Sequence, residues 1–220
     1  MFEEGSIIAL YKPVGPSSNQ MLTKVKRAIN IKKIGHAGTL DPLASGILVV
    51  GIGREATKQL WKPEFGEKEY ETVITLGAYS TTDDSEGEKT LQLVTEIPTR
   101  EMVETVINKF VGSFIQQPPT FSALKINGVP AYSLARKGKM VTLGGREVTI
   151  HSIELLSYEW PYIALRVHCD SGTYIRSLAR DVGAELNVGG FMSSLVRTRV
   201  GPFLLKDAVT IEFIESCQAP

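Results

Sequence analysis

Apolar residues recur at helical spacing in two stretches of the chain, residues 18–30 and 99–110. In the first stretch the apolar residues that share one helical face are Met21, Leu22, Val25, Ala28 and Ile29. In the second they follow Thr99, a residue type that favours helix N-caps, and are Met102, Val103, Val106, Ile107 and Phe110. Both patterns predict amphipathic helices that bury one face against the rest of the protein.

Other stretches have the patterns of β-strands. Residues 47–52 form a continuous apolar run, which predicts a buried strand, and residues 69–76 alternate, which places Tyr70 and Ile74 on one side. Further strands are expected at 7–10, 151–156 and 163–169, further helices at 54–61 and 173–186, and a short last element at 208–215. Helices and strands in this mixed order predict an α+β fold.

Residues 112–146 lack a regular pattern. Pro118 and Pro119 resist helix formation, and a short helix fits only residues 131–137. A long irregular stretch inside a compact domain is often a functional loop. Because no repeat or linker interrupts the chain, we expect one domain over residues 1–220, with 112–146 as an insertion.

The composition is that of an ordinary globular protein, with 43% hydrophobic and 22% charged residues. No apolar run approaches the length of a membrane span, and the acidic N-terminus lacks the pattern of a signal peptide. We therefore expect a cytoplasmic protein without membrane contact. The two cysteines, Cys169 and Cys217, lack metal-ligand spacing, and we expect both to be buried reduced thiols.

The net charge is zero, from 24 basic and 24 acidic residues, which argues against a broad nonspecific binder of nucleic acid. The basic residues nevertheless gather in three groups, at 24–33, at 125–139, and at Arg197 with Arg199. Each group alone is typical of a solvated face. The three together favour local contact with a polyanion such as RNA.

Residues 35–46, GHAGTLDPLASG, carry one acid between glycines and precede the apolar run of 47–52. Pro42 pushes Asp41 toward extended backbone, from which its carboxylate can point into a cleft. The same spacing fits one short helical turn, with Asp41 as N-cap, Pro42 at the first position and Gly46 at the end. Spacing alone favours the helical turn, because caps are commoner than catalytic acids.

Six blocks in order resemble the motifs of the TruB family of tRNA pseudouridine synthases, the loop at 35–48 among them. The other blocks lie at residues 11–18, 68–71, 117–125 with 131–136, 171–176 and 195–203. One block would be a weak signal, whereas six in the family's order are specific. The resemblance implies the pseudouridine synthase fold, a mixed and mostly antiparallel sheet flanked by helices.

The resemblance also implies an activity, the isomerisation of uridine 55 in the T-loop of tRNA to pseudouridine. The C1′–N1 bond breaks, the base rejoins through C5, and the uridine must first leave the base stack. No redox change occurs, so no metal or organic cofactor is required, and His36, His151 and His168 have no convincing ligand spacing. The T-arm of tRNA is the implied partner; no protein partner is implied, and a monomer is expected.

The family's essential aspartate corresponds to Asp41, a group that suits glycosidic chemistry as nucleophile or base. The resemblance places at Arg176 the cation that keeps this carboxylate ionised and oriented. Without the motif, Arg176 reads as a surface residue of a helix. Tyr70 resembles the active-site tyrosine that stacks on the extruded uracil, and its alternative is a half-buried strand tyrosine.

Five further residues are expected by resemblance to bind the substrate: His36, Leu195, Lys12, Asp84 and Tyr174. His36 resembles a histidine that intercalates where the base leaves the stack, and Leu195 a residue that packs against the base. Lys12 is expected to shape the wall of the site, and Asp84 to join a polar network that touches RNA. The alternatives are local hydrogen bonding for His36, plain core for Leu195 and a turn acid for Asp84.

Residues 112–146 are expected to act as a mobile clamp over the T-loop. Bacterial members usually carry a C-terminal RNA-binding PUA domain, whereas this sequence ends soon after its last motif, so no PUA domain is expected. Two other functions stay open. One is a tRNA-folding chaperone without chemistry, and the other is a small sugar-active hydrolase that pairs Asp41 with another acid such as Asp84.

Overall fold

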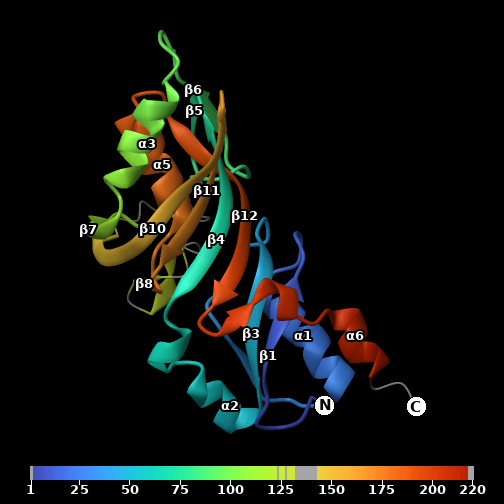
Figure 1. Ribbon diagram of the computed structural model, residues 1–220. Helices are drawn as coiled ribbons and strands as arrows, with labels where there is room; N and C mark the ends of the chain where they lie inside the picture. The colour runs from blue at the N-terminus through green and yellow to red at the C-terminus, as the bar shows by residue number, and fades with distance from the viewer. Residues whose placement is uncertain (1, 123, 127, 132–142, 218–220) are drawn as a thin grey trace. The chain divides into compact units, whose positions relative to one another are not determined.

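The computed structural model describes residues 2–217 except 123, 127 and 132–142 (Figure 1). The chain divides into two compact units, Met1–Glu71 with Leu195–Pro220 and Thr72–Ser194. Two strands, β4 (Lys68–Leu76) and β12 (Gly190–Val200), each begin in one unit and end in the other. The chain therefore passes between the units within strands and not through loops. The expectation of one catalytic domain with a mobile insertion stays a prediction.

The first unit is built on β3 (Ser45–Ile52), which is buried along nearly its whole length. β1 (Ile7–Lys12) and β2 (Ile34–Ala37) pair with β3 in antiparallel register, and the C-terminal part of β12 pairs with it in parallel. The remaining elements are α1 (Ser18–Ile29), α2 (Gly53–Gln59), η1 (Pro63–Phe65), β13 (Phe203–Leu204), η2 (Leu205–Asp207) and α6 (Ile211–Ser216).

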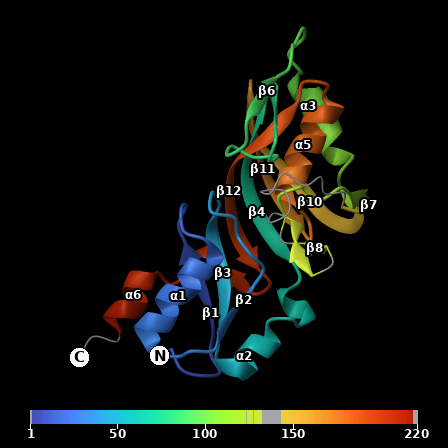
Figure 2. The same cartoon turned by 180° about the vertical axis from the view of Figure 1, so that it is seen from behind.

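Both faces of β3 are packed, because successive side chains of a strand point in opposite directions. Leu48 and Val50 belong to the cluster formed with α1 and α6, two helices that lie side by side in Figures 1 and 2. Ile47 and Val49 belong to the opposite cluster. Each such side chain contributes about 1.5–3 kcal/mol when fully buried, which explains why this strand is a continuous apolar run.

The second unit carries strands in the order β12-β4-β11-β10-β7. β10 (Arg146–Glu159) pairs in antiparallel register with β11 (Tyr162–Cys169) and with β7 (Gly112–Gln116). The helices α3 (Arg100–Asn108) and α5 (Ile175–Glu185) lie side by side (Figures 1 and 2). Two small hairpins complete the unit, β5 (Ala78–Ser80) with β6 (Lys89–Leu91) and β8 (Lys125–Ile126) with β9 (Val129–Pro130).

The predicted α+β fold, with a mixed and mostly antiparallel sheet flanked by helices, is confirmed. Both amphipathic helices form, and α1 begins with a capping box between Ser17 and Gln20. Several strands of the described residues were not expected, and the longest of them are β2, β7 and β12. Because β7 occupies residues 112–116, the prediction that the irregular region begins at 112 is wrong, and it begins after Gln116.

The short helix expected at 131–137 lies outside the described residues except for Ala131. In the part of the chain that the structure describes, no helix is both long enough and apolar enough to cross a membrane.

Candidate active site

The acidic loop between β2 and β3 makes one hydrogen-bonded turn and then enters the sheet. The N–H of Ala44 donates to the carbonyl of Asp41 at 3.0 Å, and β3 begins at Ser45. Gly46 has a φ of 110°, and a Cβ there would lie 2.3 Å from the carbonyl oxygen of Arg197 in the paired strand. The helical turn favoured by spacing is therefore right only at its start: one turn begins at Asp41, but Gly46 lies within β3, in a close pairing that only glycine allows, and does not end a helix.

The side chain of Lys12, at the end of β1, holds this turn from inside the protein. Lys12 is 0% exposed, and its ammonium donates to the carbonyls of Pro13 at 2.9 Å, Pro42 at 3.4 Å and Ala44 at 2.5 Å. Two of these three carbonyls belong to the turn that begins at Asp41. A charged donor makes stronger hydrogen bonds than a neutral one, so Lys12 fixes the backbone on which the Asp41 carboxylate is carried.

The charged groups around this turn act on one another. Burial lowers the pKa of Lys12 from 10.5 to about 8; the carboxylate of Asp41 opposes this shift, and the guanidinium of Arg197 adds to it. Burial also lowers the pKa of His36 below 6.5, and Arg197 lowers it further, against a hydrogen bond with the Gly38 backbone. At neutral pH, Lys12 is therefore charged and His36 is neutral.

Arg197 supports the same loop from the parallel strand β12. It is 1% exposed, its Nε donates to the carbonyl of Ile47 at 2.8 Å, and one terminal nitrogen donates to the carbonyl of Gly38 at 3.1 Å. The expectation that Arg197 belongs to a basic surface group is wrong, because its guanidinium is buried and donates to two backbone carbonyls. Arg199, the other member of that group, lies 3.7 Å from the carboxylate of Glu67.

The first unit thus brings together three of the expected site residues, Lys12, His36 and Asp41, around Arg197. Tyr70 in β4 and Leu195 in β12 are each 8% exposed. The alternation of β4 places Tyr70 on its buried side, which agrees with a strand tyrosine. Their roles against the uracil stay predictions.

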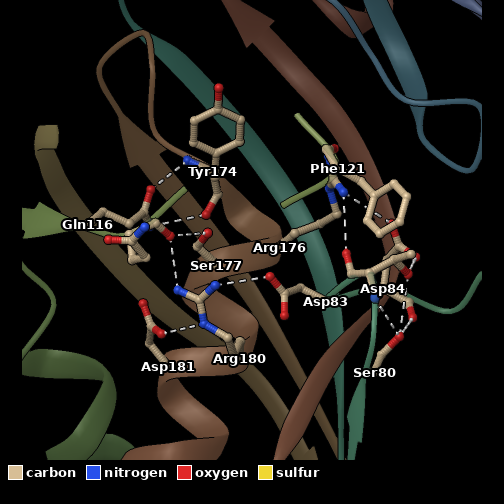
Figure 3. Close-up of polar contacts among 12 residues, drawn as sticks. Ser80, Asp83, Asp84, Gln116, Phe121, Tyr174, Arg176, Ser177, Arg180 and Asp181 are labelled. Atoms are coloured by element: carbon tan, nitrogen blue, oxygen red, sulfur yellow. Dashed lines mark hydrogen bonds and ion pairs between the residues drawn. The ribbon is translucent and has the colours of Figure 1, made fainter. Parts of the chain in front are cut away.

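In the second unit, Arg176 stands at the start of α5 and is buried (Figure 3). Its guanidinium donates to the carbonyls of Phe121 at 2.9 Å and Thr82 at 3.3 Å, and lies 3.5 Å from the carboxylate of Asp84. The alternative that Arg176 is a surface residue of a helix is therefore wrong. A guanidinium fits this task because its donors point in fixed directions toward several acceptors at once.

Asp84 is both a turn acid and a member of a polar network. Its carboxylate accepts from the N–H of Glu86 at 3.0 Å and from the hydroxyl of Thr82, and the hydroxyl of Ser80 donates to its carbonyl at 2.6 Å. Both interpretations from the sequence are thus partly right. Because the Asp84 side chain is only 4% exposed and faces Arg176, it is poorly suited to be the second acid of a hydrolase.

Tyr174 is the residue before α5, and its backbone is clamped by one side chain (Figure 3). The N–H of Tyr174 donates to Oε1 of Gln116 at 2.9 Å, and Nε2 of Gln116 donates back to the Tyr174 carbonyl at 3.1 Å. Gln116 is 1% exposed. This pairing joins the start of α5 to the end of β7, so Arg176 is placed by a strand that the sequence did not reveal.

Three residues of these networks escaped the sequence analysis: Arg197 as a buried support, Gln116, and Arg180 on α5. For Arg180 a signal exists, since it stands four residues after Arg176 and shares its helix face. For Gln116 and the buried state of Arg197 the sequence carries no signal, because their partners are distant in the chain.

The sequence matches two family descriptions over most of its length. The TruB family pseudouridylate synthase (N terminal domain) matches residues 26–175, and the tRNA pseudouridylate synthase B C-terminal domain matches residues 176–219. A tRNA pseudouridine synthase B from Phocaeicola vulgatus is 43% identical over 217 residues, covering 96% of this chain and 92% of the relative. Another, from Pseudomonas paraeruginosa, is 44% identical over 213 residues, covering 97% of this chain and 69% of the relative.

Solved structures agree with these matches. The archaeal box H/ACA sRNP Nop10–Cbf5 complex contains a chain with a TM-score of 0.72 and 28% identity, covering 98% of this chain and 54% of that one. A Cbf5–Nop10–Gar1 complex gives a TM-score of 0.71 and 32% identity, covering 94% and 52%. The present chain therefore spans about half the length of the chains in these two structures.

The family matches over residues 26–219 define the class of this protein, a pseudouridine synthase, which is an isomerase that acts on RNA. The identity to curated relatives is high and extends along nearly the whole chain. The chain belongs to the TruB family of pseudouridylate synthases.

Proposed function

We propose that the protein isomerises uridine 55 in the T-loop of tRNA to pseudouridine, with Asp41 as its nucleophile or base. The observation that carries this proposal is the turn at Asp41, which the buried ammonium of Lys12 holds through the carbonyls of Pro42 and Ala44. The tRNA substrate is supported by the names of relatives that are 43% identical over most of their own length.

The chemistry needs an ionised carboxylate at a fixed place. The C1′–N1 bond must break, C5 must bond to C1′, the C5 proton must leave and N1 must gain a proton. The charge of Asp41 attracts the buried ammonium of Lys12, which also holds the backbone of the turn. Positioning of reacting groups of this kind accounts for a large part of enzymatic rate enhancement.

The other expected residues take roles around the flipped-out uridine. Arg176 orients the Asp41 carboxylate, and Tyr70 and Leu195 contact the base. A neutral His36 suits insertion into the RNA stack, because an uncharged ring loses less hydration on burial than a charged one. Asp84, which faces Arg176, and Tyr174, which stands directly before α5, complete the proposed set of substrate-binding residues.

We further propose that residues 117–143 clamp the T-arm, and that the protein acts as a monomer in the cytoplasm, where its tRNA substrate lies. Tightly bound RNA offsets the few kcal/mol needed to extrude a base. Protection of this segment from protease on adding T-arm RNA is the expected result, and unchanged cleavage would contradict the clamp.

The deciding experiment compares wild type, Asp41→Asn and Glu55→Gln on a T-arm stem-loop, with pseudouridine mapped by mass spectrometry after chemical labelling. Glu55 is a matched control, because its carboxylate is exposed on α2 and pairs with Lys58 of the same helix. Product at uridine 55 with wild type and Glu55→Gln but not with Asp41→Asn is expected. RNA binding without product from the wild type would favour the chaperone function, which a tRNA-refolding assay on the same samples would measure directly.

A further inference from the structure

Helix α5 carries two arginines one turn apart, and each faces a different aspartate of the same turn (Figure 3). Arg176 lies 3.5 Å from Asp84, and Arg180 lies 3.0 Å from Asp83. Residues four apart share a helix face, so the two pairs stand side by side. The proposed function uses the first pair and leaves the second without a role.

Arg180 uses each of its nitrogens on a different segment of the second unit. Its Nε donates to Asp181 on its own helix at 2.8 Å, one terminal nitrogen donates to Asp83 at 3.0 Å, and the other donates to the carbonyl of Gln117 at 3.0 Å. Figure 3 shows the guanidinium between Asp181 and Asp83. A lysine has a single charged nitrogen and cannot bridge three acceptors in fixed directions.

Gln117 is the first residue of the segment 117–143. Its side chain donates to the carbonyl of Leu143 at 2.5 Å, which ties the two ends of the segment together. Its own carbonyl accepts from Ser177 at 2.8 Å and from Arg180 at 3.0 Å. Further along the same segment, the carbonyl of Phe121 accepts from Arg176. One face of α5 thus carries Arg180, which contacts Gln117 at the start of this segment, and Arg176, which the proposed function places beside Asp41.

The turn at Asp83 has a backbone that suits this arrangement. Asp83 has a φ of 61°, in the left-handed region that few non-glycine residues adopt. Its carbonyl accepts from the N–H of Met192 at 3.0 Å, which fixes that conformation. In extended backbone, successive side chains point to opposite sides. The left-handed residue instead lets Asp83 and Asp84 both face α5.

We propose that Arg180, together with Asp83, is a positioning residue that fixes the place of the Arg176 guanidinium. It does so by holding the Asp83–Asp84 turn and the backbone of Gln117 against helix α5. The inference rests on the proposed function and extends it to residues that contact neither Asp41 nor the reacting base. According to this inference, this face of α5 connects the segment 117–143, which the proposed function places on the RNA, with Arg176 at the site of the reaction.

The test compares Arg180→Lys, Asp83→Asn and the variant with both changes against wild type. The matched control is Glu185→Gln, which breaks an exposed ion pair of α5 with Lys109. Three quantities are measured: the single-turnover rate of pseudouridine formation, the dissociation constant for T-arm RNA, and hydrogen exchange of peptides spanning 80–92 and 112–122. Asp83→Asn keeps the shape of the side chain, so it preserves the test should Arg180→Lys not fold.

We expect the rate to fall about 10- to 100-fold in each single variant, as for other small displacements of catalytic groups, while RNA binding stays at the wild-type value. The combined variant should be no slower than either single variant, because the pair acts as a unit. Exchange in both peptides should rise in these variants and not in Glu185→Gln.

A rate in Arg180→Lys and Asp83→Asn equal to that of Glu185→Gln would overturn the proposal. A loss of RNA binding that accounts for the whole loss of rate would overturn it as well. A wild type that forms no pseudouridine would refute the proposed function. The exchange data would then test the role of Arg180 and Asp83 without the activity, and unchanged exchange in both peptides would refute that role.

Discussion

Replacing Lys12 with methionine separates the stability of the Asp41 turn from its function. Methionine keeps most of the length of the apolar chain and removes the ammonium. Of the three carbonyls that lose a donor, that of the buried Ala44 has the least access to water, whereas Pro13 and Pro42 are exposed residues. One buried acceptor left without a partner costs about 1–3 kcal/mol.

The opposing effect is of the same size. Burial lowers the pKa of Lys12 from 10.5 to about 8, which corresponds to roughly 3 kcal/mol of unfavourable free energy for holding the charged form inside the protein. Removing the charge relieves this cost. The two effects nearly cancel, so we expect the free energy of unfolding of Lys12→Met at neutral pH to lie within about 2 kcal/mol of wild type.

The activity should not be spared in the same way. Without the ammonium, Asp41 loses both a charge partner in the first unit and the hydrogen bonds that hold its turn. We expect the single-turnover rate of pseudouridine formation to fall at least about tenfold. RNA binding, measured by filter retention, should be unchanged.

The pH dependence supplies a second check with a definite sign. The pKa of Lys12 is lower in the folded protein than its ordinary value of 10.5. Between about pH 8 and 10.5 the unfolded chain therefore binds the proton more often, and wild type gains stability with rising pH relative to Lys12→Met. Urea unfolding of both proteins at neutral pH and near pH 10 measures this. If wild type and Lys12→Met differ by the same free energy of unfolding at both pH values, the reasoning is refuted. It is also refuted if Lys12→Met forms pseudouridine at the wild-type rate.

Three further predictions follow from other contacts. Gly46→Ala should lower the free energy of unfolding by roughly 2–4 kcal/mol, because its Cβ would meet the Arg197 backbone at a positive φ; Gly144→Ala, where a Cβ meets nothing within 4 Å, is the control in the same denaturation experiment. His36 should titrate by NMR below its ordinary pKa of 6.5, and stability should fall as pH drops below that value in wild type but not in His36→Gln. Arg176→Lys should reduce the single-turnover rate about 100-fold or more, because one ammonium cannot replace three directed contacts; a rate near wild type would show that a charge alone suffices.

The elements that the sequence predicts well are those that a local pattern determines. Helix α1 follows from apolar spacing and from Ser17 with Gln20 as a capping box, all within a dozen or so neighbouring residues. β3 is recognised because both its faces are covered by apolar clusters. Strand β12 escapes the same analysis, since its buried Arg197 and polar Ser193 and Thr198 find partners elsewhere in the chain.

The candidate site divides in the same way. Asp41, Tyr70 and Arg176 are named by family resemblance, which the sequence carries in full. The residues that hold the Asp41 loop in place are not indicated by the sequence, because contacts such as that of Arg197 with Ile47 join residues 150 positions apart in the chain. Such a contact exists only once the sheet has formed. No spacing rule indicates that an arginine in a polar stretch is buried beneath the loop of another strand.

The path of the chain through its two units has a consequence for synthesis. Residues 72–194 form one continuous unit, whereas the other unit needs residues from both ends of the chain. On the ribosome, the continuous unit can fold while the protein is still being made. The N-terminal unit stays incomplete until Arg197 emerges and contacts the carbonyls of Gly38 and Ile47. The Asp41 loop therefore gains this support only after residue 197 has been made, so shorter nascent chains carry the acid without the contacts from Arg197.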